Sequence, residues 1–293
     1  MQKVSVIIPV YNQWHLVKRN VDALLLFDKI HIAEIIIVDD CSPEKNVFEF
    51  NNELVKVISN EHNKGYAGTV NNGLKKAHSS IVVLLDSDAY PICPFIENLL
   101  AMYAADTSLG CIGFQTIDDE GNKTGSYTFE PSLLGLLVGQ QLEMRLNIKK
   151  SNDVIPYSCS VSFRKACLED LGYLNEKDFP VLDADFDISM HIHRSKWKLI
   201  IADDITVSHS GGHSYKINYK RVLLFHDSRW KLLRNHGQIH FPRFIKMLLK
   251  SRIHLELNIL RVLSLFSSNT ASESYDDKVR GRKILLQHAD LYE

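Results

Sequence analysis

Ile81-Val82-Val83-Leu84-Leu85-Asp86-Ser87-Asp88 is the segment that indicates the fold class most clearly. Five consecutive apolar residues without polar alternation predict a strand buried on both faces, as in a parallel sheet covered by helices. Two carboxylates separated by one residue follow this strand directly. Ligands of open α/β sheets bind beyond the carboxyl ends of the strands, so this acidic end predicts the place of a binding crevice.

Three further buried strands are predicted upstream, alternating with helical patterns. They are Val4–Ile8, which we expect Pro9 to end, Glu34–Val38 and Leu54–Ser59. Asn12 is expected to cap the first helix, and Tyr66–Ala77 to form the second. This alternation is typical of a mostly parallel sheet flanked by helices.

The ends of these strands are polar. The first strand is followed by Pro9-Val10-Tyr11-Asn12 and the second by Asp39-Asp40. Because carboxyl ends of parallel strands meet at one edge, we expect these residues to share a crevice with Asp86 and Asp88. Asn63-Lys64-Gly65 precedes the second helix, whose N-terminus can favour an anion, although an ordinary loop explains the same residues.

The second half of the chain has a less regular pattern. The expected elements are a strand at Cys111–Thr116, a turn at Asp118–Asn122, helices at Leu133–Leu146 and Asp185–Arg194, and strands at Leu199–Ala202 and Ile205–Ser208. His209 follows the last of these strands. We place the domain boundary near Ser214, between residues 1–214 and an extension at residues 215–293.

Composition and charge exclude several classes of protein. The chain has 293 residues, is 45% hydrophobic and 24% charged, and has a formal net charge of −1, which predicts no nucleic-acid partner. Residues 1–214 carry 19 basic and 28 acidic side chains, whereas residues 215–293 carry 15 and 7. The charge is therefore divided between two electrically different parts.

The predicted location is the cytoplasm. The five cysteines include no Cys-x-x-Cys pair and are odd in number, as is typical of a reducing compartment. The apolar run that follows Lys3 is too short for a signal peptide, and no stretch approaches the ~18 consecutive apolar residues of a membrane span.

Asp86 and Asp88 can turn toward one divalent cation, because Mg²⁺ and Mn²⁺ prefer oxygen ligands and keep positions for phosphate oxygens. A capped turn that opens a helix is the alternative explanation. His209 can be a ligand of the same cation or a donor to phosphate, and it can equally be a surface histidine.

Asp183-Ala184-Asp185-Phe186-Asp187 holds three carboxylates at alternate positions. On a helix they cannot all face one way, so one or two of them reach a common site. One could accept the proton of an incoming hydroxyl as a general base, and a solvated acidic helix start is the alternative. The sequence contains no dinucleotide-binding or P-loop glycine motif, nucleophile elbow or zinc-protease helix.

In their order and spacing, these segments resemble the family 2 glycosyltransferases, which have the GT-A fold. The resemblance covers about residues 3–214 and is carried by Val4–Asn12, Ile35–Pro43, Asn63–Gly65 with Asn71 and Gly73, Leu84–Asp88 and Val207–Ser214. It implies an α/β catalytic domain with a mostly parallel central sheet, followed by a helical C-terminal extension. Across that extension the layout is similar to bacterial rhamnosyltransferase-like members.

The resemblance also implies a nucleotide-diphospho-sugar donor and a Mn²⁺ or Mg²⁺ ion. The residues expected to contact the donor are Pro9, Tyr11, Asn12, Asp39, Asp40, Asn63, Lys64, Asp86 and Ser87. Those expected to bind the metal are Asp88, Asp86 and His209.

The activity implied is an inverting sugar transfer with Asp185 as the base and Asp187 in support. The family commonly has a carboxylate where this chain has Ala184, and Asp183 lies nearby, so the choice among the three aspartates stays open. The expected acceptor is a glycan or lipid-linked saccharide of a bacterial surface polysaccharide. The alternatives are a sugar-phosphate nucleotidyltransferase and a non-catalytic nucleotide-binding or scaffold protein.

The C-terminal extension predicts basic amphipathic helices. Residues 215–261 hold 11 Lys and Arg but only two acidic side chains. Apolar residues recur among them at Phe241, Phe244, Ile245, Leu248, Leu249, Ile253, Leu257 and Leu260. We expect peripheral attachment to the anionic inner face of the cell membrane. The alternative is a helical cap on the catalytic domain, which can include a homo-oligomer interface.

Overall fold

The computed structural model describes residues 2–139, 142–143, 153–209, 219–264 and 272–292. They fall into two compact units, Met1–Glu130 with Ser151–Ser214, and Pro131–Lys150 with Tyr215–Glu293. We call these the α/β unit and the helical unit. The segment Pro131–Lys150 belongs to the helical unit, although the sequence patterns indicate only one boundary, near Ser214.

The α/β unit is built on one mixed sheet of eight strands in the order β3-β2-β1-β4-β9-β6-β10-β5. The strands are β1 (Val4–Val10), β2 (Ile32–Asp39), β3 (Val55–Ser59), β4 (Ile81–Leu85), β5 (Ala89–Pro91), β6 (Leu109–Ile117), β9 (Ser160–Arg164) and β10 (Lys198–His209). The pairings on both sides of β9 and between β10 and β5 are antiparallel, and the other four are parallel. This arrangement confirms the predicted α/β class and five of the predicted strands, which correspond to β1, β2, β3, β4 and β6, at or near their expected bounds.

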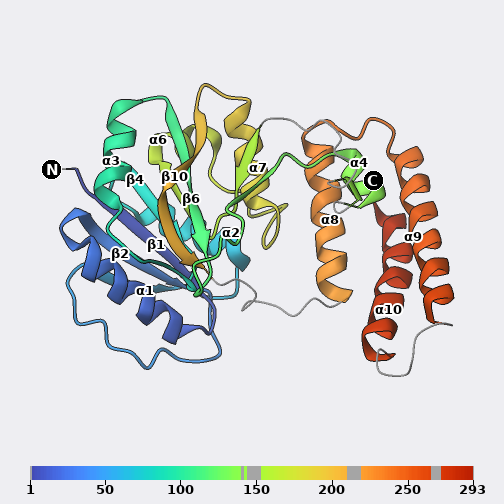
Figure 1. The fold of residues 1–293 in the computed structure, drawn as a ribbon, viewed down its shortest axis with the longest axis horizontal. Helices are drawn as coiled ribbons and strands as arrows, with labels where there is room; N and C mark the ends of the chain where they lie inside the picture. Colours follow the sequence, from blue (N-terminus) through green and yellow to red (C-terminus); the bar gives the residue numbers. More distant parts are fainter. Residues whose placement is uncertain (1, 140–141, 144–152, 210–218, 265–271, 293) are drawn as a thin grey trace. The chain divides into compact units, whose positions relative to one another are not determined.

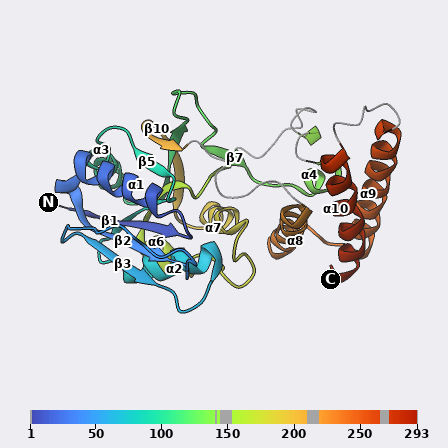
Figure 2. The same ribbon diagram turned by 90° about the horizontal axis from the view of Figure 1, so that it is seen from below.

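Helices cover both faces of the sheet. Figure 2 shows α1 (Trp14–Phe27) and α3 (Ile96–Ala105) on one face, and α2 (Gly65–Lys76) on the other. The remaining elements of this unit are α6 (Lys165–Leu171), α7 (Ala184–His193), the short 3-10 helix η1 (Lys29–His31), and the β7 (Tyr127–Phe129) and β8 (Val154–Pro156) pair. Because both faces are covered, β1 and β4 are buried at every residue, which explains their unbroken apolar sequences.

Three local expectations were wrong. Strand β1 continues through Pro9 to Val10, because its pairing with β4 stops at Ile7 and Pro9 lies where the strand has one neighbour rather than two. Asn12 does not cap α1, since its side chain accepts a hydrogen bond from the Glu44 amide instead. The two strands expected at the end of the unit are one strand, β10, with a shift of register.

The helical unit contains α4 (Leu133–Val138), α8 (Tyr219–Asn235), α9 (Pro242–Ser264), α10 (Ser272–His288) and the 3-10 helix η3 (Ala289–Leu291), labelled in Figure 1. Their apolar side chains form a core of their own, which includes Trp230, Leu249 and Leu285. The helix expected over Leu133–Leu146 is interrupted, because α4 ends at Val138 and Gly139 follows it with a φ of 92°. Of the rest of that prediction, residues 140–141 and 144–146 lie outside the described residues. Within the described ranges, no helix is both long and apolar enough to cross a membrane.

A buried carboxylate on β2 stabilises the α/β unit. Glu34 accepts hydrogen bonds from the Ser5 hydroxyl, the Lys56 ammonium and the His78 backbone amide at 2.8, 2.9 and 2.9 Å. These donors lower the pKa of Glu34 to about 2, although burial acts in the opposite direction. Because the folded pKa lies below the unfolded value, this stabilisation is present above pH 4.5 and is lost as the pH falls toward 2.

We therefore expect Glu34→Gln to lower the free energy of unfolding by ~2 kcal/mol at pH 7, and by much less near pH 2. Urea unfolding across this pH range measures the difference, with exposed Glu53→Gln as the control. An equal loss of stability at both pH values would contradict an electrostatic role for Glu34.

Candidate active site

Strand register brings the polar strand ends to one edge of the sheet. Strand β1 pairs in parallel with β2 and with β4, so that Val10 lies opposite Asp39 and Ile7 opposite Leu84. The residues after these strands therefore emerge at the same edge. The polar strand ends therefore share the sheet edge at which the sequence predicts a crevice, with Asp86 and Asp88 following β4.

His209 reaches this edge through a pairing that the sequence does not reveal. Strands β5 and β10 are antiparallel, and His209 lies opposite Ala89, the residue after Asp88. The His209 Nε2 atom is 3.5 Å from Asp88 Oδ1. One potential ligand atom from each of Asp86, Asp88 and His209 lies within 4.8 Å of those of the other two. The structure thus brings together the three residues predicted to bind metal.

The electrostatics of this cluster suit a cation. Burial and the neighbouring Asp88 carboxylate raise the pKa of Asp86 to about 6. Hydrogen bonds to Asp88 and Cys159 raise the pKa of His209 to about 11. Without a metal ion, the protonated imidazole of His209 supplies positive charge beside Asp88, and a metal ion bound here would take the place of that proton. Two carboxylates and one imidazole are also ligands that divalent metals accept, so the residues present fit such an ion.

Tyr66 and Ser158 connect Asp86 to the second acidic motif. The Tyr66 hydroxyl is 3.0 Å from Asp86 Oδ1 and 3.2 Å from the Ser158 carbonyl oxygen. The Ser158 backbone amide in turn donates to Asp185 Oδ2 at 3.3 Å. Sequence reasoning missed both residues, because Ser158 lies in an irregular loop and Tyr66 reads as an ordinary residue of the first turn of a helix.

Of the three alternating aspartates, Asp185 faces this network. Burial and the nearby Asp183 carboxylate raise its pKa to about 6. Asp187 is buried, with its Oδ1 atom 3.7 Å from His191 Nε2, while Asp183 is a buried residue of left-handed backbone conformation before α7. Asp187 is thus directed to a different partner, His191, whereas Asp183 lies close enough to Asp185 to raise its pKa.

The residues after β1 and β2 hold one another in place. The Ser42 hydroxyl and the Ser42 backbone amide both donate to Asp39 Oδ1. The Asn12 backbone amide donates to the Ser42 hydroxyl at 2.8 Å. Tyr11 beside them is 45% exposed and free to contact a ligand. Ser87 donates through its hydroxyl to Gln13 at 2.7 Å, which ties the acidic motif to the same group.

Asp40, unlike Asp39, is directed toward the start of α2. Its buried carboxylate accepts hydrogen bonds from the backbone amides of Lys64 and Gly65 at 2.7 and 3.0 Å and from the Asn60 side chain at 2.9 Å. The side chains of Asn63 and Lys64 remain exposed beside it. Asp40 thus occupies the N-terminal end of α2, where the sequence allowed for an external anion.

Part of the last predicted motif cannot be placed. Residues 210–214 lie outside the residues that the structure describes. Of Val207–Ser214, only Val207, Ser208 and His209 are therefore assigned a position, all three in β10.

A mixed sheet between helices, with acidic side chains clustered at its strand ends, makes the chain an α/β protein with a candidate cation site. Glycosyl transferase family 2 matches residues 5–172. The chain belongs to this family, as the order of its motifs indicates.

Two curated relatives show the range of the family. The chain is 32% identical over 102 residues to WfgD of Escherichia coli, a UDP-Glc:α-D-GlcNAc-diphosphoundecaprenol β-1,3-glucosyltransferase, covering 34% of this chain and 40% of the relative. It is 30% identical over 195 residues to a dolichol-phosphate mannosyltransferase of Pyrococcus furiosus, covering 61% and 51%. The matches thus span about half or less of each relative.

Solved structures confirm the GT-A fold. A mannosyltransferase from Pyrobaculum calidifontis, solved with GDP-Man and Mn²⁺, has a TM-score of 0.59 and 15% identity, covering 99% of this chain and 86% of that chain. TarS of S. aureus (residues 1–349), solved with UDP-GlcNAc, has a TM-score of 0.56 and 18% identity, covering 99% and 84%.

Proposed function

We propose that this protein is an inverting, metal-dependent glycosyltransferase. It moves a sugar from a nucleoside-diphosphate donor to a hydroxyl group of a glycan or lipid-linked saccharide, in the synthesis of a bacterial surface polysaccharide. The observation that carries the proposal is the convergence of Asp86, Asp88 and His209 at one sheet edge, connected through Tyr66 and Ser158 to Asp185. Family membership favours this activity over that of a nucleotidyltransferase.

Asp86, Asp88 and His209 would hold a Mn²⁺ or Mg²⁺ ion. When bound, this ion supplies positive charge that stabilises the departing nucleoside diphosphate. Two similar structures, one solved with GDP-Man and Mn²⁺ and the other with UDP-GlcNAc, support a nucleotide-sugar donor. On the nucleotide side, Pro9, Tyr11, Asn12 and Asp39 would contact the base and ribose.

Asp185 would act as the general base. Its raised pKa of about 6 keeps it ionised at neutral pH and yet more basic than an ordinary aspartate, as proton abstraction from a hydroxyl requires. The deprotonated oxygen attacks the anomeric carbon from the face opposite the leaving group, so the configuration inverts. The Ser158 amide fixes the orientation of Asp185 by donating to one of its oxygens.

Nucleotide binding tests the proposal directly. Thermal unfolding is measured with UDP, GDP, dTDP or CMP, each with Mn²⁺ or with EDTA. One diphosphate is expected to raise the midpoint by several degrees with Mn²⁺ only, because a ligand that binds the native state alone stabilises it. No metal-dependent rise with any of the four nucleotides would contradict the proposal and favour a scaffold protein.

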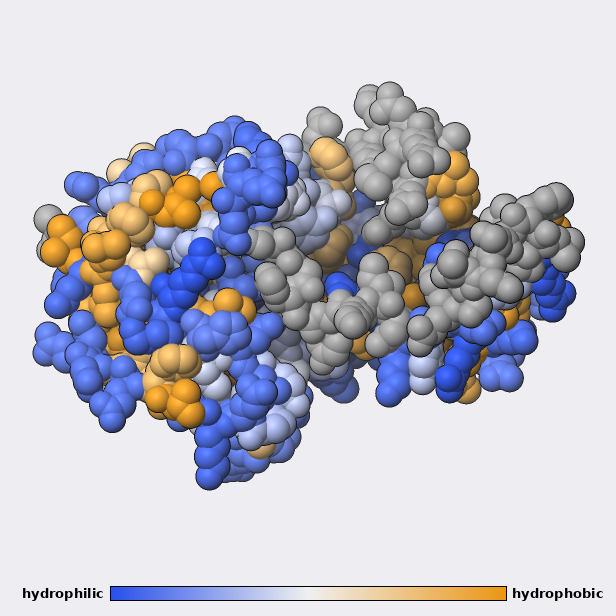
Figure 3. Space-filling model, turned by 60° about the horizontal axis from the view of Figure 1, so that its bottom comes forward, coloured by the Kyte–Doolittle hydropathy of each residue, from blue (hydrophilic) through white to orange (hydrophobic). Residues whose placement is uncertain are grey.

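The exposed side of α9 supports attachment to a membrane surface. One side of this helix packs Ile245, Leu249 and Ile253 into the core of the helical unit. Apolar side chains are exposed on another side of the helix and at Phe241, which precedes it. Their exposed fractions lie between 49% and 74%, and the residues are Phe241, Phe244, Met247, Leu255, Ile259 and Val262. Hydrophobic residues are visible among hydrophilic ones over the helices of this unit (Figure 3). The exposed Arg243 and Arg261 of the same helix favour anionic lipid.

We expect wild-type protein to float with vesicles that contain about one-third anionic lipid, because each basic residue near such a surface contributes ~1 kcal/mol. Phe244→Glu is expected to reduce recovery at least fivefold, since it places a carboxylate in the apolar surface. Leu26→Glu, at a 76% exposed position of α1, is the matched control. Equal recovery with neutral and anionic vesicles would contradict the electrostatic attraction.

A further inference from the structure

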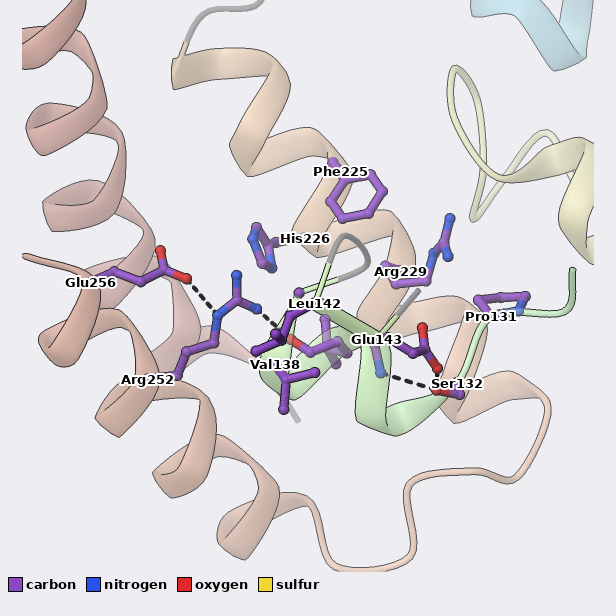
Figure 4. A pocket seen from close by; sticks show the side chains of 13 residues that line it. Pro131, Ser132, Val138, Leu142, Glu143, Phe225, His226, Arg229, Arg252 and Glu256 are labelled. Atoms are coloured by element: carbon purple, nitrogen blue, oxygen red, sulfur yellow. Dashed lines mark hydrogen bonds and ion pairs between the residues drawn. The ribbon is translucent and has the colours of Figure 1, made fainter. Parts of the chain in front are cut away.

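The helical unit contains a cavity of about 370 Å³ that the sugar transfer described above does not use. Its described lining residues all belong to this unit. Figure 4 shows His226 and Phe225 entering it from α8, Arg252 and Glu256 from α9, and Ser132 and Glu143 from the α4 segment. The volume lies within the range of ~300–1,000 Å³ that is usual for small-molecule sites.

The charged groups of the lining are balanced. Arg252 donates through Nε to Glu256 at 2.6 Å and through Nη1 to the Leu136 carbonyl oxygen at 2.6 Å. Arg229 and Glu143 add one further charge of each sign. The described wall therefore offers both donors and acceptors, as a ligand rich in hydroxyl groups requires.

Gly135 leaves the room that the Glu143 carboxylate needs. A Cβ atom on Gly135 would lie 2.3 Å from Glu143 Oε2. Gly139 is favoured for another reason, because its φ of 92° disfavours any side chain there. The absence of a side chain at Gly135 thus allows a carboxylate to approach the backbone closely.

His226 supplies an unsatisfied polar group. The residue is 8% exposed, and its Nδ1 atom has no hydrogen-bond partner among the described residues. Burial and the nearby Arg252 lower its pKa to about 4, so the imidazole is neutral at pH 7. A hydroxyl group can satisfy either tautomer of a neutral imidazole, because it both donates and accepts. Such a buried polar atom costs about 1–3 kcal/mol when it stays unpaired.

We propose that this cavity binds a neutral sugar unit of the acceptor glycan, with Glu143 and Arg252 bonding its hydroxyl groups and Phe225 packing against the apolar face of its ring. A sugar combines hydroxyl groups with an apolar ring face, which matches a wall of paired charges beside an aromatic side chain. This inference rests on the proposed function for the identity of the glycan. It assigns the helical unit a saccharide site separate from the donor site.

Saturation-transfer NMR on the full chain tests the inference. The probes are the methyl glycosides of glucose, mannose, N-acetylglucosamine and rhamnose, each without nucleotide. At least one is expected to receive saturation from wild-type protein, with a dissociation constant raised at least fivefold by Glu143→Gln and by His226→Phe. Lys250→Gln, which breaks an ion pair with Asp290 on the surface of α9, is the matched control. Circular dichroism verifies that each variant is folded.

The outcomes distinguish this site from the donor site. Saturation that persists in Glu143→Gln and His226→Phe but disappears in Asp88→Asn would place the sugar at the sheet edge and overturn the inference. Binding of none of the four glycosides would overturn it as well, even where nucleotide with Mn²⁺ still stabilises the protein. Sugar binding at the cavity without any nucleotide binding would uphold this site and contradict the proposed transferase.

Discussion

Replacing Asp185 by asparagine is expected to lower kcat by about a thousandfold, with the KM for the donor nearly unchanged. General-base catalysis contributes ~10²–10⁴-fold, and an amide cannot accept the proton. The amide oxygen can still accept the hydrogen bond from the Ser158 backbone, so the loop should keep its position. Steady-state rates of nucleoside-diphosphate release measure the effect, and exposed Asp170→Asn on α6 is the control.

The pH dependence of wild-type activity tests the same role of Asp185. The pKa of Asp185 is raised to about 6, so it becomes protonated and inactive as a base below that pH. We expect kcat/KM of the wild type to fall tenfold per pH unit below about pH 6. Because the pKa of Asp86 is also about 6, the variant is compared through kcat at saturating donor and Mn²⁺, where Asp185→Asn should lack this dependence. An unchanged kcat in Asp185→Asn would transfer the role of base to Asp183 or Asp187.

Replacing Asp88 by asparagine is expected to lower kcat/KM by about a thousandfold, equal to ~4 kcal/mol of transition-state stabilisation. Loss of this carboxylate leaves Asp86 and His209 as the remaining members of the cluster. The Mn²⁺-dependent rise in thermal stability with nucleoside diphosphate should disappear as well. Asp22→Asn, in a surface ion pair with Lys18 on α1, is the matched control.

Added Mn²⁺ makes this prediction specific. If Asp88 binds the metal, raising the Mn²⁺ concentration should recover part of the activity of Asp88→Asn and none of that of Asp185→Asn. Wild-type activity that is indifferent to EDTA, together with an unimpaired Asp88→Asn, would contradict metal dependence.

The sequence predicted those parts of the fold whose pattern is local. Strand β4 was predicted at its observed bounds because five buried apolar residues are followed by an acidic pair. The antiparallel strand β9 was missed, since Ser160–Arg164 alternates small polar and apolar residues inside an irregular region. Its insertion between β4 and β6 adds two of the three antiparallel pairings and carries Ser158 and Cys159 to the candidate active site.

The sequence predicted the residues of the candidate site whose side chains are themselves metal ligands. Asp86, Asp88 and His209 were singled out from an acidic motif and a strand end, and the structure places them together. Tyr66 could not be found in this way, because only the tertiary fold shows that its hydroxyl points at Asp86. In the helical unit, the sequence pattern lists Phe244 and Ile245 together as apolar residues of α9. Only the structure shows that Phe244 is exposed and Ile245 buried.

The interaction of Asp40 with the start of α2 has a consequence for the leaving group. A helix N-terminus can carry part of the charge of a phosphate, as in many nucleotide-binding proteins. Here an internal carboxylate already neutralises that dipole. In the proposed reaction, a departing diphosphate would therefore need its counter-charge from elsewhere, a role that the proposed divalent ion would fill.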